Sequence, residues 1–113
     1  MQDLTVVARA AAQSWKTLMP GVSIALLREH DGERSLLLRM DPGARFPRHA
    51  HPGGEQLLVV SGDVQLAEHA LNAGDYLYTA PGEVHAVASR LGCVLFITVR
   101  SPIEVLKDAP EGS

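Results

Sequence analysis

GARFPRHAHPGGEQLLVVSG, residues 43–62, is the stretch that decides the fold, because it places two histidines and a glutamate close together and follows them with an apolar run. Its glycines and prolines disfavour a helix. On an extended strand, residues i and i+2 point to the same face, so His49 and His51 project side by side. Glu55 follows the turn at 52–54 and can face back toward the two imidazoles.

A further histidine, His85, stands in a similar setting, after a Pro-Gly turn at 81–82 and at the start of the segment HAVAS. Three neutral imidazoles and one carboxylate suit a divalent first-row ion such as Zn, Fe, Mn, Ni or Co. The sequence therefore predicts one metal ion bound by His49, His51, Glu55 and His85. The alternative is that these side chains are present without binding an ion.

The spacing of these residues resembles that of the cupin superfamily. The first cupin pattern, G-x5-H-x-H-x3-E-x6-G, fits without a gap at Gly43, His49, His51, Glu55 and Gly62. The second cupin pattern fits at Gly74, Gly82 and His85, and departs at Ala80, where cupins have proline, and at Ser89, where they have asparagine. Neither departure is a ligand, so the resemblance implies that they affect a turn and the pocket lining rather than the ion.

A narrower resemblance is carried by Trp15, the Pro-Gly-Val at 20–22, the segment HAHPGGE and Gly92 with Cys93. These are similar to the ChrR-type cupins, the zinc-binding C-terminal domains of certain anti-sigma factors, whose stand-alone relatives include diketone-cleaving dioxygenases. The resemblance implies an RmlC-like jelly roll that binds one divalent ion, with zinc expected first and Fe, Mn or Ni as alternatives.

Two functions follow from this resemblance. One is a small-molecule or stress-sensing regulatory module, and the other is an Fe(II)-dependent dioxygenase of a small diketone or hydroxyketone. The sequence offers no dedicated general acid or base besides the four ligands, so no catalytic residue is assigned. Whether the chain is an enzyme stays open at this stage.

The rest of the chain consists of short apolar segments separated by turn residues, which is typical of an all-β sandwich or barrel. We expect a single domain with an N-terminal arm at 1–14, a cupin jelly-roll β-barrel at 15–106 and a flexible tail at 107–113. The alanines of the arm favour a helix as the alternative. Asp31 and Gly32 mark a hairpin turn, and Gly62 with Asp63 is expected to end the strand that starts at Glu55.

Alternation along the strands predicts which side chains face the ion. The expected inward-facing residues are Leu57 and Val59 with Glu55, Val87 and Ser89 with His85, and Pro47 and Arg45 with the other two histidines. The strand at 76–79 can turn only one face inward, and alternation leaves open whether Tyr76 and Tyr78 lie on that face. The predicted pocket is mostly apolar.

The composition of the chain limits which kinds of partner it is expected to bind. The chain has 113 residues, which suffices for one domain, and its net charge of −3 offers no basic surface, so no direct binding of nucleic acid is expected. One cysteine, no long apolar run and no signal-peptide pattern favour a cytoplasmic protein without membrane contact. Val6, Val7 and Trp15 suit packing against a second subunit, which predicts a homodimer. A small molecule in the barrel is the other expected partner.

Overall fold

The hairpin of Val22–His30 (β2) and Glu33–Met40 (β3) turns at the two residues that the sequence marks. Asp31 has a φ of 48° and Gly32 a φ of 79°. Both lie in the left-handed region, which a two-residue type I′ turn requires because its twist matches that of the strands. The predicted turn is confirmed.

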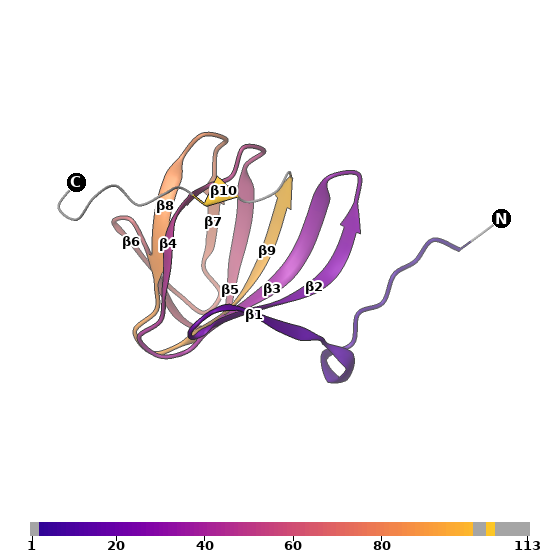
Figure 1. Cartoon of the computed structure of the whole chain (residues 1–113), viewed down its shortest axis with the longest axis horizontal. Coiled ribbons are helices and arrows are strands. Elements are labelled where there is room, and N and C mark those ends of the chain that lie inside the picture. The colour runs from indigo at the N-terminus through magenta and orange to yellow at the C-terminus, as the bar shows by residue number, and fades with distance from the viewer. Residues whose placement is uncertain (1–2, 101–103, 106–113) are drawn as a thin grey trace.

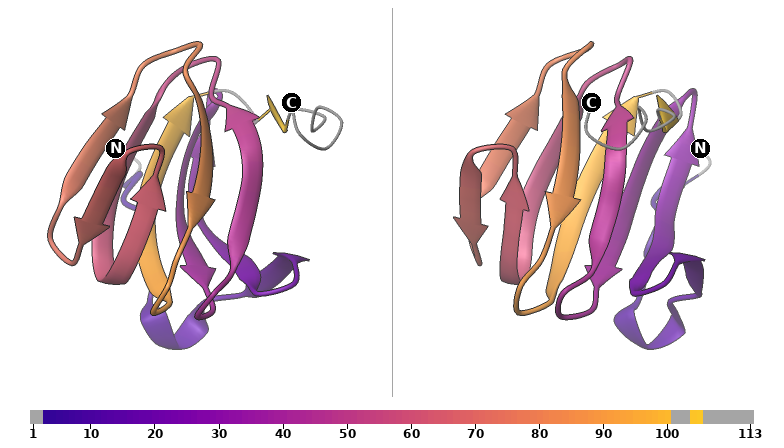
Figure 2. Two further views of the ribbon diagram at one scale, coloured as in Figure 1. Left: turned by 90° about the vertical axis from the view of Figure 1, so that its left-hand side faces the viewer. Right: turned by 60° about the vertical axis from the view of Figure 1, so that its left-hand side comes forward.

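The computed structural model describes residues 3–100 and 104–105. The other strands are β1 (Trp15–Met19), β4 (Arg45–Ala50), β5 (Glu55–Leu66), β6 (His69–Asn72), β7 (Tyr76–Thr79), β8 (Val84–Ala88), β9 (Cys93–Arg100) and β10 (Glu104–Val105). They pair antiparallel in the order β1-β2-β3-β9-β5-β8-β4-β10, with β6 and β7 paired to β5. The sheet curls so that its two halves face each other across the interior (Figures 1 and 2). The predicted all-β fold is confirmed.

Strand β5 joins the two halves of the curled sheet. Its first part pairs with β9, and its last residues pair with β6 and β8. The prediction that Gly62 and Asp63 end this strand is wrong, because the hairpin to β6 forms at Ala67, whose φ is 49°. Gly62, with a φ of 79°, instead lies where a Cβ would overlap the carbonyl oxygen of Gly92. The glycine therefore permits a close backbone approach rather than a turn.

Alternate residues of β3, β5 and β9 line much of the interior. On β9, Cys93, Leu95, Ile97 and Val99 are buried, and the residues between them are half-buried. The other buried apolar residues of the core are Val22, Leu36, Leu38, Met40, Phe46, Leu57, Val59, Val64, Leu66 and Val87. Period-two burial of this kind is what the alternating sequence predicts for a sheet with one face inward. Cys93 is a core residue, and its burial raises the pKa of its thiol.

The N-terminal segment projects from the body of the fold (Figure 1). Leu4, Val6 and Val7 are 78%, 59% and 66% exposed. The helical alternative for this segment is limited to one 3₁₀ turn at Ala10–Ala12. The described part of the chain contains no helix long and apolar enough to cross a membrane. The expected tail at 107–113 lies outside the described residues.

Candidate metal centre

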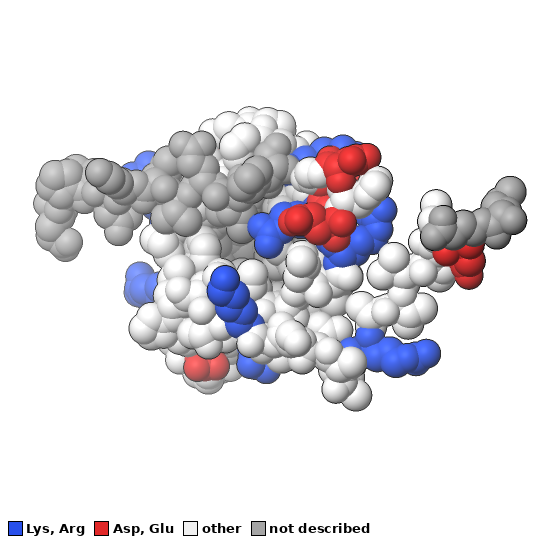
Figure 3. Space-filling model, turned by 45° about the vertical axis from the view of Figure 1, so that its right-hand side comes forward, with Lys and Arg blue, Asp and Glu red and all other residues white. Residues whose placement is uncertain are grey.

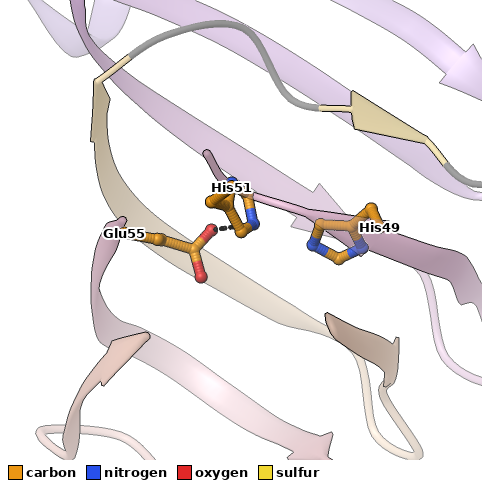
Figure 4. Close-up of side chains that lie close together, drawn as sticks. All are labelled: His49, His51 and Glu55. Carbon is orange, nitrogen blue, oxygen red and sulfur yellow. Dashed lines mark ion pairs between the residues drawn. The ribbon is translucent and has the colours of Figure 1, made fainter. Parts of the chain in front are cut away.

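Two histidines at the end of β4 face the interior: His49 lies on the strand and His51 directly follows its last residue, Ala50. His49 and His51 are 4% and 1% exposed, and their ring centroids lie 4.7 Å apart with the rings at 90° to each other. Figure 4 shows both rings on the same side of the strand, as the i, i+2 spacing predicts. The predicted placement of the two imidazoles is confirmed.

Glu55 reaches the same place from the first residue of β5. The turn before it is closed by a hydrogen bond from the Gly54 N–H to the His51 carbonyl oxygen, 2.9 Å long, and Gly54 has a φ of 87°. The carboxylate is 4% exposed, and its Oε2 lies 3.0 Å from Nε2 of His51 (Figure 4). One donor atom from each of the three side chains lies within 4.8 Å of the others. One ion can therefore contact all three residues.

The donor atoms of this group fit a metal ion. Both ring nitrogens of His51 are buried without a hydrogen-bond partner among the described residues, because its 3.0 Å contact with Glu55 lacks hydrogen-bond geometry. Buried polar atoms are normally satisfied, and leaving one unpaired costs about 1–3 kcal/mol. A divalent ion would satisfy the imidazole and the carboxylate together.

His49 is oriented by the backbone of its own strand. Its Nδ1 lies 2.9 Å from the Pro47 carbonyl oxygen. A carbonyl oxygen only accepts, so Nδ1 carries the proton and donates it. Nε2 therefore keeps its lone pair for an ion, which is the usual arrangement of a metal-binding histidine.

Burial keeps His49 in the form that binds metal. Loss of solvation lowers the pKa of His49, and the neighbouring His51 and His85 lower it further. The hydrogen bond to Pro47 and the charge of Glu55 act in the opposite direction, but the net shift is downward. The imidazole is thus neutral over a wider pH range than that of a free histidine, and only the neutral ring is a ligand.

His85, the fourth predicted ligand, lies on β8 directly across the ladder from His49. Its Nδ1 is buried without a hydrogen-bond partner among the described residues, although the residue as a whole is half-buried. His85 is outside the group whose donor atoms lie within 4.8 Å of one another. The structure brings three predicted ligands together and places the fourth on the neighbouring strand, so its ligation stays a prediction.

A cavity of about 290 Å³ opens beside this group. Its lining is mostly apolar and comes from both halves of the sheet: Leu18, Ile24, Leu36, Leu38, Met40, Phe46, Leu57, Val87, Leu95 and Ile97. The remaining lining residues are His49, His51 and Glu55 together with Lys16 and Arg34. Small-molecule sites have this character, with an apolar wall and a few convergent polar groups.

One extra residue on β4 changes which side chains face the cavity. Phe46 pairs with Val87, and the next pair toward the turn is His49 with His85. Between these two pairs the chain advances three residues on β4 but only two on β8, so β4 contains one extra residue. This bulge turns Phe46 inward, with its ring 4.8 Å from that of His49. The prediction that Pro47 and Arg45 face the ion is therefore wrong.

The remaining polar candidates lie away from the group formed by His49, His51 and Glu55. Tyr76 and Tyr78 are each 57% exposed. Both tyrosines therefore lie on the outer face of β7, which answers the question that alternation left open. Ser89 is buried as predicted, but its hydroxyl donates to the Asp63 carbonyl oxygen at 2.7 Å, outside the cavity lining. Arg34 also lines the cavity and was not predicted to do so, although it stands two residues before Leu36 in the row of β3 residues that alternate into the core.

The chain is similar in sequence to a known family and to a curated protein. The family described as the ChrR Cupin-like domain matches residues 3–102. The DNA damage-repair/toleration protein DRT102 of Arabidopsis thaliana is 36% identical over 87 residues, which are 72% of this chain and 27% of that protein. The chain therefore spans little more than a quarter of this curated relative.

Solved structures show the same fold. A chain in the complex of Rhodobacter sphaeroides SigE with the anti-sigma ChrR is 26% identical with a TM-score of 0.73, over 80% of this chain and 50% of that one. An acetylacetone dioxygenase from Acinetobacter johnsonii has a TM-score of 0.81 at 14% identity, over 96% of this chain and 80% of that one, a likeness of fold alone. The chain has the cupin fold and belongs to the ChrR cupin-like family.

Proposed function

We propose that this chain is a metal-binding sensor module that holds one divalent transition metal and binds a small oxygenated organic molecule beside it. The ligands are His49, His51, Glu55 and His85, and zinc is the first candidate for the ion. The likeness to a chain of the SigE–ChrR complex supports a regulatory role. In that role the occupied cavity would alter contacts with a protein partner.

One observation carries this proposal. A buried histidine with two unpaired ring nitrogens lies 3.0 Å from a buried carboxylate, at the edge of a mostly apolar cavity. Without an ion, this arrangement leaves polar atoms unsatisfied in the interior, which proteins avoid. With an ion, the same side chains form a donor set of a familiar kind.

The residues of the chain have separate tasks in this proposal. Pro47 holds the tautomer of His49, and burial keeps that imidazole neutral. Phe46, Leu57 and Val87 line the cavity and exclude water from it. A bound divalent ion would supply a Lewis-acid centre for an oxygen atom of the organic ligand.

Metal analysis tests the proposal directly. Protein purified without added metal or chelator should contain about one divalent ion per chain, and replacing His49, His51 and Glu55 together with alanine should remove it. His30 and His69 are exposed and provide the matched control, since replacing both with alanine should leave the metal content unchanged. Full retention of metal in the triple variant would refute the assignment.

A second candidate function, an Fe(II)-dependent dioxygenase of a small diketone or hydroxyketone, is favoured by the cavity lining. Among the described residues, the polar side chains that line it besides His49, His51 and Glu55 are Lys16 and Arg34, and neither is a carboxylate or an imidazole that could carry a proton. Chemistry at this site would depend on the redox properties of the ion. Oxygen consumption by the Fe(II) form with a panel of chelating dicarbonyl compounds, absent with zinc and abolished by His85→Ala, would establish this function over the sensor.

A further inference from the structure

Arg34 points into the cavity of the metal centre. It lies on β3 in the same row as Leu36, Leu38 and Met40, which are buried on the inner face, and it lines the cavity with them. Across the sheet, Arg34 pairs with Val99, and Val99 pairs with Glu55. Paired residues point to the same face, so Arg34 and Glu55 face one cavity from positions two strands, or about 10 Å, apart.

The positive charge of Arg34 is only partly compensated. Its Nε lies 2.9 Å from Oε2 of Glu29, whose side chain is 55% exposed, and an ion pair of this kind contributes little in water. No other acidic residue among those described forms an ion pair with Arg34. Arg28 and Arg100 share Glu33 and, unlike Arg34, do not line the cavity. Acidic and basic side chains lie close together on the exposed surface (Figure 3).

The charges that line the cavity have a definite arrangement. Glu55 is its only acidic lining residue among those the structure describes, and it lies within the metal-binding group. Arg34 and Lys16 are the two cations of the lining, and the walls between are apolar. In an apolar enclosure, a cation attracts an anion more strongly than it does in water, and an arginine binds a carboxylate through two parallel hydrogen bonds.

We infer that Arg34 is a specificity-determining residue that binds a carboxylate, and that the ligand of this site is a small oxygenated carboxylic acid. This inference rests on the proposed function, because the oxygen atoms at the other end of the ligand bind at the metal centre. The carboxylate lies against Arg34, and Lys16 adds a second positive charge on the same cavity wall. A cavity of about 290 Å³ limits the ligand to a small molecule.

Two compounds of equal chain length test the inference. Heptane-2,4-dione is a neutral chelating diketone, and 4,6-dioxoheptanoate is the same chain with a carboxylate in place of one end methyl group. Calorimetry of the zinc-loaded protein at low salt should show that the acid binds about tenfold more tightly or better, since a charge-assisted pair has this strength. Arg34→Gln should remove the preference by weakening the binding of the acid. Arg39→Gln, an exposed arginine on the outer face of the same strand, should keep the preference.

A second readout does not depend on the metal. The Nε–Hε signal of Arg34 in the NMR spectrum should shift with 4,6-dioxoheptanoate and not with heptane-2,4-dione, in metal-free as well as in zinc-loaded protein. Equal affinity for the two compounds, an undiminished preference in Arg34→Gln, no binding of either, or an unshifted Arg34 signal would overturn the inference. A failure of the proposed function is seen separately, as metal retained by the variant that lacks His49, His51 and Glu55.

Discussion

Single residues in this protein have chemical roles that depend on their burial. His49 and His51 would be ordinary titrating groups on a surface, but the interior keeps the pKa of His49 low and leaves the nitrogens of His51 without protein partners. Both effects favour a metal ion, because ligation needs neutral imidazole and satisfies its lone pairs.

The pH dependence of metal binding follows at this scale. Protons compete with the ion, so metal content should be constant from about pH 8 down to about 6.5 and fall at lower pH. The lowered pKa of His49 delays this loss, because its ring stays neutral below the value of a free histidine. Equilibrium dialysis followed by metal analysis measures it. Occupancy that stays unchanged down to about pH 4.5 would contradict ligation by histidine.

The same shift affects the stability of the metal-free protein. The unfolded chain takes up a proton at a histidine at about pH 6.5, whereas the folded chain takes it up at His49 only at lower pH. The stabilisation that the folded state gains from keeping His49 neutral is therefore complete above about pH 6.5. It is lost as the pH falls through the pKa that His49 has in the folded state. Urea unfolding across this pH range should show that the free energy of unfolding declines as the pH falls. In His49→Gln, this pH-dependent decline should be smaller.

At the scale of elements, β5 connects the metal centre to the far side of the sheet. It starts with Glu55, pairs with β9 up to Gly62, and then pairs with β6 and β8. The register shift between Val59 and Ser61 bends the strand, and the absence of a side chain at Gly62 lets it pass against Gly92. The position of Glu55 thus depends on a strand held at both ends.

Replacing Gly62 with alanine should destabilise the fold more than the same change at Gly74. Both glycines have positive φ, of 79° and 93°, so alanine costs about 1–2 kcal/mol of conformational strain at either position. Gly74 has no atom within 4 Å of an added Cβ, whereas at Gly62 the Cβ would overlap the backbone of Gly92. Urea unfolding of the two variants measures the difference. Equal losses of stability would show that the close approach contributes nothing.

At the scale of the whole molecule, the projecting arm and the outer face of the sheet both expose apolar side chains. Leu4, Val6 and Val7 are exposed on the arm, and Leu58, Val60, Tyr76 and Tyr78 are exposed on β5 and β7. Exposed apolar surface of this kind, together with an arm that projects from the body, is typical of a subunit interface.

We therefore expect a homodimer in which the arm packs on the partner subunit. Light scattering at micromolar concentration should give twice the mass of the chain, and deletion of residues 1–14 should weaken the association. Leu4→Ser with Val6→Ser and Val7→Ser is the milder variant, since it removes apolar contacts and keeps the length of the arm. A monomer that is unaffected by the deletion would contradict this expectation.

The sequence by itself placed three of the four predicted ligands together, namely His49, His51 and Glu55. The i, i+2 spacing of His49 and His51 and the turn before Glu55 are local features, so strand geometry alone placed the three side chains together. The turn at Asp31 was equally local, because a type I′ turn depends only on the conformation of its own two residues.

Only the tertiary structure decided what surrounds this group. The bulge that turns Phe46 inward arises from the pairing of β4 with β8. Arg34 and Glu55 face the same cavity because β9 lies between their strands and pairs with both. The continuation of β5 through Gly62 likewise depends on the backbone of Gly92. Pairing between distant segments fixes these features, and a local pattern of residues cannot specify it, since a shift of one residue in register reverses which side chains face the core.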